Sequence, residues 1–206
     1  MKIALVIHRY GDGIAGGSEA HARGLAQELR RSHEVEVLTT TARDYLTWRN
    51  EFEAGESLVD RIRVTRFPVQ RPRDLGRFAA VSDHVFNEAH NRDDEERWII
   101  ENGPVCPDLI DEISKRADVD FFLCYSYRYF TGIKGALAAR DRAVLIPTAE
   151  DDPAVRLSVF GELFRGARAF LYLTPEEQEL IETTAGALFA PSRVIGSGLN
   201  VQRSGP

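Results

Sequence analysis

The chain has 206 residues, of which 43% are apolar and 28% are charged, and its formal net charge is −6. This length suits one sizeable domain and is short for two. The negative charge gives no overall attraction for nucleic acid, so no nucleic-acid partner is expected. No apolar run approaches the roughly 20 residues that cross a membrane, and residue 2 begins a strand rather than a signal peptide. Cys106 and Cys124 lack the spacing of metal ligands and are interpreted as reduced thiols, so the sequence predicts a cytoplasmic globular protein without a metal site.

The chain opens with a strand, a glycine-rich turn and a helix. Residues 2–7 form an apolar strand, residues 11–17 contain four glycines, and Ser18 is the expected N-cap of a helix that extends to residue 31. A helix that begins in a glycine turn offers free backbone N–H groups and the positive end of its dipole. Missing side chains let a phosphate come close. The opening unit therefore predicts an anion site.

Gly11, Gly13 and Gly16 match the dinucleotide-binding pattern G-x-G-x-x-G, but the surroundings of that pattern differ. Three residues separate the first glycine from the strand, and the second strand ends in threonines where an acidic residue would bind the ribose. The nearest acid, Asp44, lies past the strand end. Dinucleotide binding is therefore poorly supported, and the glycines could also serve only to let the helix pack close to the sheet.

Apolar runs of strand length alternate with helical stretches along the chain. The expected strands are 2–7, 34–40, 61–67, 119–124, 143–147, 169–173 and 192–195, and the expected helices are 18–31, 74–89, 93–101, 107–116, 133–140, 154–164 and 175–184. Thr174 and Glu177 form a capping box at the start of the last helix. The pattern predicts an α/β, Rossmann-like doubly wound fold with a mostly parallel sheet of about seven strands and helices on both faces. Its ligand crevice should lie beyond the carboxyl ends of the strands, where the strand order reverses.

Residues 16–40 resemble the N-terminal domain of family 4 retaining glycosyltransferases of the GT-B architecture. The matching positions are Gly16, Gly17, Glu19, Leu25, Ala26, Leu29, His33, Glu34 and Val35. Residues 195–200 are similar to the family's Gly-Val-Asp segment that leads into a second domain, with Asn200 in place of the aspartate. The resemblance implies one half of a GT-B fold. Residues 1–200 would be the acceptor-binding domain and 201–206 the start of the interdomain linker. The C-terminal donor-binding domain would be missing from this chain.

The resemblance also implies a function in carbohydrate biosynthesis. Such enzymes transfer a sugar from a nucleotide sugar to an acceptor with retention of configuration, and no metal ion or other cofactor is expected. Gly16, Gly17 and Ser18 would approach the donor diphosphate across the interdomain cleft, which is the anion site that the opening unit predicts. This half of the enzyme is expected to be inactive alone.

Aromatic and hydroxyl groups mark the acceptor side. The strand expected at 119–124 leads into Tyr125, Ser126, Tyr127 and Arg128. Aromatic rings stack on apolar sugar faces and hydroxyls bond to sugar oxygens, so this loop suits a sugar, polyol or glycolipid acceptor. Tyr10, after the first strand, is a candidate wall of the same pocket. The alternatives are an aromatic-rich surface loop and a packing tyrosine.

Three acidic residues follow the strand expected at 143–147. Family members often place a histidine here that contacts the donor sugar, and this chain has Glu150 at or next to that position. Glu150 is therefore the candidate catalytic group, and Asp151 is a candidate acceptor contact. The alternative is a solvated acidic turn that caps the following helix.

Residues 61–77 hold six arginines and one acid in an otherwise acidic protein. A basic segment of this kind can bind anionic lipid, which suggests peripheral contact with the inner face of a membrane. A solvated strand and loop, or a docking site for an anionic acceptor, would give the same composition.

Two other functions remain open at this stage. A single-domain Rossmann enzyme of the epimerase or reductase type would bind a nucleotide, but the ribose acid and a Tyr-x-x-x-Lys pair are missing. A non-catalytic module that binds sugar or lipid would need no reactive group. The fold alone cannot separate these alternatives.

Overall fold

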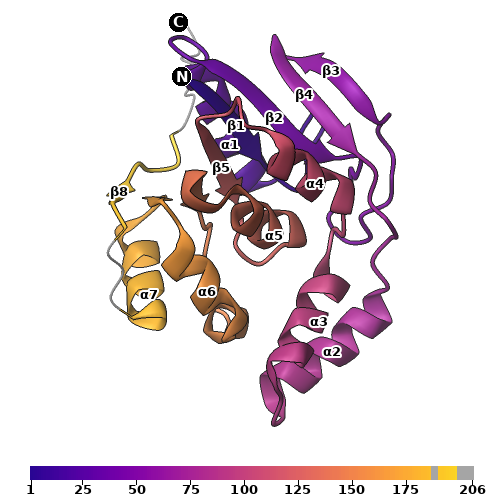
Figure 1. The fold of residues 1–206 in the computed structure, drawn as a ribbon. Helices are drawn as coiled ribbons and strands as arrows, with labels where there is room; N and C mark the ends of the chain where they lie inside the picture. Colours follow the sequence, from indigo (N-terminus) through magenta and orange to yellow (C-terminus); the bar gives the residue numbers. More distant parts are fainter. Residues whose placement is uncertain (187–189, 199–206) are drawn as a thin grey trace, which may run out of the picture.

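The computed structural model describes residues 1–186 and 190–198, which form an α/β fold around one eight-stranded sheet with the order β3-β4-β2-β1-β5-β6-β7-β8 (Figure 1). All neighbouring strands pair in parallel except β3 and β4. The mostly parallel, doubly wound sheet predicted from the sequence is confirmed. Asn200 and the expected linker 201–206 lie outside the described residues.

The element bounds follow the sequence pattern closely. The strands are β1 (Lys2–Val6), β2 (Glu34–Thr40), β3 (Gly55–Val59), β4 (Ile62–Phe67), β5 (Phe121–Tyr125), β6 (Ala143–Ile146), β7 (Ala169–Tyr172) and β8 (Ser192–Val194). The helices are α1 (Gly17–Leu29), α2 (Leu75–Asn87), α3 (Arg92–Asn102), α4 (Pro107–Lys115), α5 (Phe130–Ala139), α6 (Val159–Gly166) and α7 (Pro175–Ala185). No helix among the described residues is both long and apolar enough to span a membrane.

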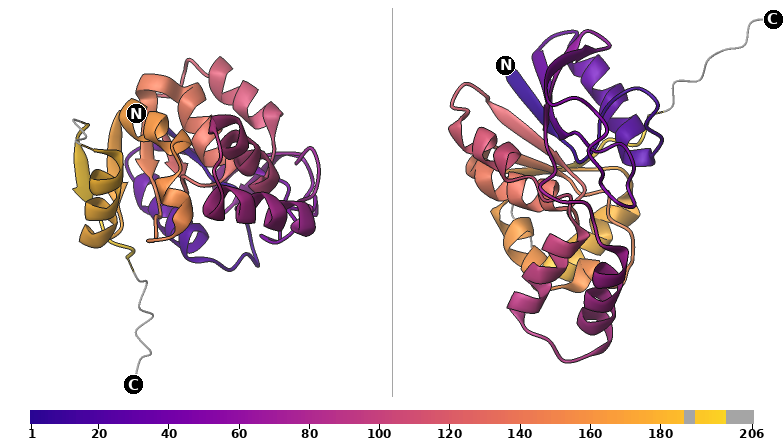
Figure 2. Two further views of the ribbon diagram at one scale, coloured as in Figure 1. Left: turned by 90° about the horizontal axis from the view of Figure 1, so that it is seen from below. Right: turned by 90° about the vertical axis from the view of Figure 1, so that its right-hand side faces the viewer.

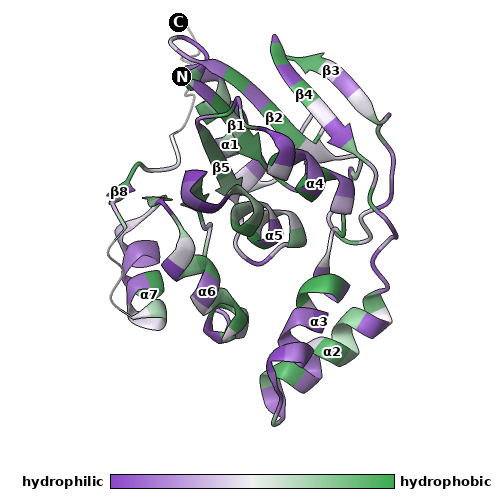
Figure 3. Ribbon diagram, viewed as in Figure 1, coloured by the Kyte–Doolittle hydropathy of each residue, from purple (hydrophilic) through white to green (hydrophobic). Residues whose placement is uncertain are grey.

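Two apolar clusters, one on each face of the sheet, form the core. Alternate residues of β1 point to opposite faces, so Ala4 and Val6 join one cluster while Ile3 and Leu5 join the other. The first cluster packs under α4 to α7 and continues between α2 and α3. The second packs under α1, which lies across the sheet from α4 to α7 (Figure 2). β1 and β5 are mostly hydrophobic, as Figure 3 shows, because both faces of these central strands are covered.

The sheet has eight strands rather than about seven. β3 is an edge strand whose residues are exposed except Val59, so it has no apolar run to reveal it. It pairs with β4 through a two-residue turn at Asp60 and Arg61, with φ of 50° and 63°. Such turns favour glycine, and this one has none. The hairpin therefore leaves no turn signal in the sequence.

The helix expected at 154–164 is divided into a 3₁₀ turn (Pro153–Arg156) and α6. The reason is a contact with α3. The buried carboxylate of Glu95 accepts hydrogen bonds from the backbone N–H groups of Ser158 and Val159 at 3.0 and 2.7 Å and from the Ser158 hydroxyl. This carboxylate satisfies the first N–H groups of α6 and fixes where the helix starts.

The strand order of the sheet reverses between β1 and β5, which is the topological switch point of the fold. After β1 the strands add on one side as β2 and β4, and from β5 onward they add on the other side. The connection between the two series contains α2 and α3, which extend as a pair beyond the carboxyl edge of the sheet (Figures 1 and 2). A crevice is expected at the carboxyl ends of β1 and β5, because neighbouring connections diverge there.

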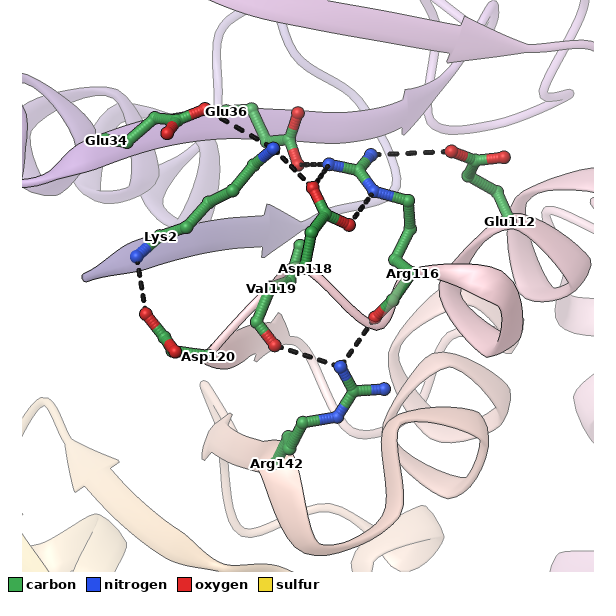
Figure 4. Close-up of polar contacts among 9 residues, drawn as sticks. All are labelled: Lys2, Glu34, Glu36, Glu112, Arg116, Asp118, Val119, Asp120 and Arg142. Carbon is green, nitrogen blue, oxygen red and sulfur yellow. Dashed lines mark hydrogen bonds and ion pairs between the residues drawn. The ribbon is translucent and has the colours of Figure 1, made fainter.

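Charged residues join the strands at the opposite, amino edge of the sheet (Figure 4). The guanidinium of Arg116, which follows α4, pairs with Glu36 of β2 and with Asp118 before β5. Asp118 also pairs with Lys2 of β1. The side chain of Glu36 is only 4% exposed, so its charge needs the arginine. This network fixes the N-terminal ends of three adjacent strands.

Arg116→Met should lower the free energy of unfolding by about 3 kcal/mol, because it leaves the buried Glu36 carboxylate without its cation. Arg31→Met is the matched control. Arg31 pairs with Glu28 at 2.9 Å, but the side chains are 74% and 63% exposed, and such pairs are worth less than about 1 kcal/mol. Urea denaturation measures both losses. Equal losses in the two variants would contradict the special role of the buried pair.

Candidate functional site

A cavity of about 270 Å³ lies at the expected crevice. Its lining residues follow three adjacent strands, with β5 between β1 and β6. They are Gly17 and Ser18 after β1, Ser126, Tyr127, Arg128 and Tyr129 after β5, and Thr148, Glu150 and Asp152 after β6. The structure therefore brings together six of the predicted site residues, which are Gly17, Ser18, Ser126, Tyr127, Arg128 and Glu150.

The first wall of the cavity is the N-terminus of α1. Gly16, not the expected Ser18, is the N-cap residue, and having no side chain it makes no cap hydrogen bond. Ser18 lies in the first turn, where its hydroxyl donates a hydrogen bond of 2.9 Å to Glu19 Oε2. The first N–H groups of a helix have no partner within the helix, and they carry the positive end of its dipole. An uncapped start at the cavity wall is suited to binding an anion.

The buried carboxylate of Glu19 connects this wall to the end of β1. Glu19 is buried and bonded to two residues that follow β1: Arg9, whose Nε donates at 2.8 Å, and His8, whose Nε2 lies 3.1 Å away. Burial alone would raise the pKa of Glu19, but the hydrogen bond with His8 and the charge of Arg9 outweigh it and lower the pKa to about 2. Burial lowers the pKa of His8. Arg9 is therefore the permanent counter-charge at neutral pH.

Gly16 and Gly17 have different surroundings. A Cβ atom at Gly16 would lie 2.1 Å from Glu19 Oε2, so this position has no room for a side chain. A Cβ atom at Gly17 would meet nothing within 4 Å. A side chain at Gly16 would therefore collide with the Glu19 carboxylate, while Gly17 borders the open space of the cavity.

The second wall contains two residues with unusual backbone conformations. Ser126 has φ of 63° and Thr148 has φ of 50°. Such values are uncommon for residues other than glycine and are genuine outliers for a β-branched residue. Their hydroxyl oxygens lie 2.8 Å apart and form a hydrogen bond across the ends of β5 and β6. Backbone strain of this kind persists only where the surroundings enforce it, and it is concentrated at functional sites.

Glu177 of α7 holds the strained loop after β6. Its carboxylate accepts hydrogen bonds from the backbone N–H groups of Ala149 at 2.8 Å and Leu173 at 2.6 Å. The predicted capping box is therefore half present. The Thr174 hydroxyl accepts from the backbone N–H of Glu177, while the Glu177 side chain bonds outside the helix.

Tyr127, Arg128 and Asp152 form the polar end of the cavity. Arg128 Nη1 donates to Asp152 Oδ2 at 2.6 Å, and the Tyr127 hydroxyl donates to Asp152 Oδ1 at 3.4 Å. Burial, followed by the negative charge of Asp152, raises the pKa of Tyr127. Tyr127 is therefore a neutral hydrogen-bond donor at physiological pH. Glu150 is exposed and lines the same cavity, and its negative charge adds to the raised pKa of Tyr127.

Four predicted site residues do not line this cavity. Gly16 lies beside the Glu19 carboxylate and is not among the lining residues. Tyr10 is 1% exposed in the apolar cluster beneath α1, which does not fit the prediction that it walls the acceptor pocket. Tyr125 is fully buried, and its hydroxyl lies 3.0 Å from Nδ1 of His21. Asp151 is exposed and pairs with Arg156.

The arginine-rich segment divides between interior and surface. Arg66 is buried, donates to the Tyr10 carbonyl at 3.0 Å and lies over the Phe52 ring. Arg73 lies over the rings of Trp48 and Phe78. Both guanidinium groups are engaged in contacts within the protein, with Arg66 buried and Arg73 half-buried. Membrane contact through the remaining arginines stays a prediction.

Several site residues were not singled out from the sequence. Thr148 and Asp152 lie beside Glu150 in the same acidic loop, and Tyr129 continues the aromatic run after β5. His8, the first of the three residues that separate the first strand from Gly11, contacts Glu19. Its position directly after a central strand was the available signal, because such positions face the crevice.

Comparisons with known proteins support the fold. No family model matches the sequence, and no curated protein matches it. A solved structure of sucrose-phosphate synthase from Thermosynechococcus elongatus is similar, with a TM-score of 0.54 and 12% identity over 97% of this chain and 91% of that one. A longer structure of the same enzyme gives a TM-score of 0.53 at 12% identity. The match covers 97% of this chain but 48% of the longer one, so this chain has the fold of about half of that enzyme.

Gly16→Ala should lower the free energy of unfolding by roughly 1–3 kcal/mol, because the new methyl group would collide with the buried Glu19 carboxylate. Gly17→Ala is the control, since its Cβ atom meets open space, and it should change the stability by less than about 0.5 kcal/mol. Chemical denaturation of both variants provides the comparison. A stable Gly16→Ala variant would show that Glu19 moves freely.

The free energy of unfolding should fall as the pH drops below about 6.5. The unfolded His8 binds a proton near pH 6.5, whereas burial lowers its pKa in the folded protein, so acid favours the unfolded chain. Glu19 acts in the same direction between its ordinary pKa of 4.5 and its folded value of about 2. Burial also lowers the pKa of His21, which adds to the first step.

His8→Gln should therefore reduce the pH dependence of stability between about pH 6.5 and 5, as measured by thermal unfolding at several pH values. The control is His84→Gln. His84 is exposed and hydrogen-bonded to Glu88, which raises its pKa, so its removal should not weaken the loss of stability in acid. An unchanged slope in His8→Gln would place the titrating group elsewhere.

Proposed function

We propose that this chain is the acceptor-side domain of a glycosyltransferase that moves a sugar from a nucleotide-sugar donor to an acceptor with retention of configuration. A second domain would bind the donor. The main support is the cavity in which the uncapped start of α1 at Gly17 meets the hydroxyl-rich ends of β5 and β6. The likeness to about half of sucrose-phosphate synthase is consistent with this reading of the fold.

The two walls fit different parts of the reaction. The start of α1 offers backbone N–H groups and a dipole to a leaving diphosphate, which needs stabilisation as its charge develops. Ser126, Thr148 and Tyr127 offer hydroxyl groups to the hydroxyls of an acceptor. Glu150 lines the same cavity and is the candidate for contact with the reacting hydroxyl. Strained strand ends keep these groups in fixed positions, so little reorganisation is needed during the reaction.

The direct test is an assay of the full-length polypeptide encoded by the gene that contains these residues. A panel of nucleotide sugars is incubated with sugar and polyol acceptors, and the release of nucleoside diphosphate is measured. Acceptor-dependent release is expected, and NMR of the product should show the anomeric configuration of the donor. A hydride transfer or epimerisation of the nucleotide sugar without any acceptor would favour the single-domain Rossmann enzyme instead.

In that enzyme, Gly17→Val should lower kcat/KM by about 100-fold while the melting temperature changes little. The branched side chain would occupy the space at the start of α1 and displace the diphosphate from its N–H groups. Gly24→Val is the matched control, since Gly24 is also in α1 and also faces open space, but it does not line this cavity. Equal kinetic losses in the two variants would remove the glycine turn from the active site.

A further inference from the structure

We propose that the acceptor end of this cavity selects a polyhydroxylated molecule that carries an ammonium group, such as an amino sugar or an aminocyclitol. The inference rests on the proposed transferase function and specifies the charge of its acceptor. It follows from the distribution of charge around the cavity.

Three charged side chains line the cavity, and their charges do not cancel. Arg128 is paired with Asp152 at 2.6 Å, so its charge is already neutralised. Glu150 lines the same cavity, and within the described part of the chain no salt bridge forms at its carboxylate. The neighbouring arginine Arg156 pairs with Asp151 instead. The formal charge of the lining is therefore −1, and the unmatched charge belongs to Glu150.

The strand order separates this negative charge from the anion site. Gly17 follows β1 and Glu150 follows β6, and β5 lies between these two strands. An anionic group is favoured at the start of α1 and disfavoured beside Glu150, so a ligand that spans the cavity has a defined orientation. The reacting end of the acceptor should consequently be neutral or cationic.

The hydroxyl groups around Glu150 suit the rest of such a molecule. The charges of Asp152 and Glu150 both act on the Tyr127 hydroxyl and help to keep it protonated as a donor. The bonded hydroxyls of Ser126 and Thr148 lie at the ends of the two adjacent strands. Hydroxyl groups can both donate and accept hydrogen bonds, so they can bind neighbouring hydroxyls of a sugar or cyclitol ring. The carboxylate of Glu150 would bind the ammonium group.

Glucosamine and glucose are suitable probes, because they differ in a single amino group. Two-dimensional NMR titration of the protein, at a pH where the amine is protonated, should give a Kd for glucosamine roughly fivefold lower than for glucose, which is the upper range for a partly exposed ion pair. The shifted signals should include Ser126, Thr148 and Glu150. Inorganic phosphate, as a third probe, should shift the signals of Gly17 and Ser18.

Glu150→Gln should abolish the preference for glucosamine and leave phosphate binding at Gly17 intact. Asp151→Asn is the matched control. It removes the same charge from the next residue, which lies outside the cavity, and it should retain the preference. Equal affinities for the two sugars in the unmodified protein would overturn the proposal, as would a preference that survives Glu150→Gln. If neither sugar binds, the assigned acceptor class is wrong. The transferase proposal is tested separately, and it would still be supported by acceptor-dependent release of nucleoside diphosphate from the full-length enzyme.

Discussion

The buried carboxylate of Glu19 is the contact on which the geometry of the candidate site depends. A charge in the protein interior costs several kcal/mol unless a counter-charge and hydrogen bonds offset that cost, and Arg9, His8 and Ser18 supply them. The same contact explains two local features. Gly16 must lack a side chain because a Cβ atom there would meet the carboxylate, and the Ser18 hydroxyl, in the first turn of α1, donates to the same carboxylate. The network around Glu19 therefore fixes the position of the start of α1 at the cavity wall.

The opposite wall is built on a similar principle, in which distant residues hold a strained segment. The positive φ of Thr148 would relax if its loop were free, but Glu177 of α7 binds the adjacent Ala149 N–H. The loop after β5 is held from the other side, where Asn102 of α3 donates to the Arg128 carbonyl at 2.8 Å. The strained backbone lowers the free energy of unfolding, and the burial of two large apolar clusters compensates for this cost. Helices far from the cavity therefore contribute to its shape.

Periodicity in the sequence predicted the parallel sheet, the glycine turn and the three strand ends at which the site lies. It could not predict the direction of individual side chains at those ends. Tyr125 and Tyr127 are two residues apart and would share a face in a regular strand, but the positive φ of Ser126 interrupts the alternation. Tyr125 points into the cluster beneath α1, and Tyr127 reaches the opposite cluster with its hydroxyl at Asp152. Likewise, Glu95 fixes the start of α6 although it lies 63 residues earlier in the sequence, so no local sequence pattern could have predicted this contact.

The arginine-rich segment shows why composition alone is a weak guide to surface charge. Arg73 is half-buried between aromatic rings and Asn102, to whose backbone and side-chain oxygens it donates at 2.7 Å. Burial lowers the pKa of Arg73 to about 10, so the group remains charged at neutral pH. Since Asn102 also donates to the Arg128 carbonyl, the guanidinium of Arg73 is connected through a single side chain to the loop that lines the cavity. The composition of residues 61–77 suggests a membrane-binding patch. In the folded protein, however, Arg73 of this segment supports the loop that lines the candidate site.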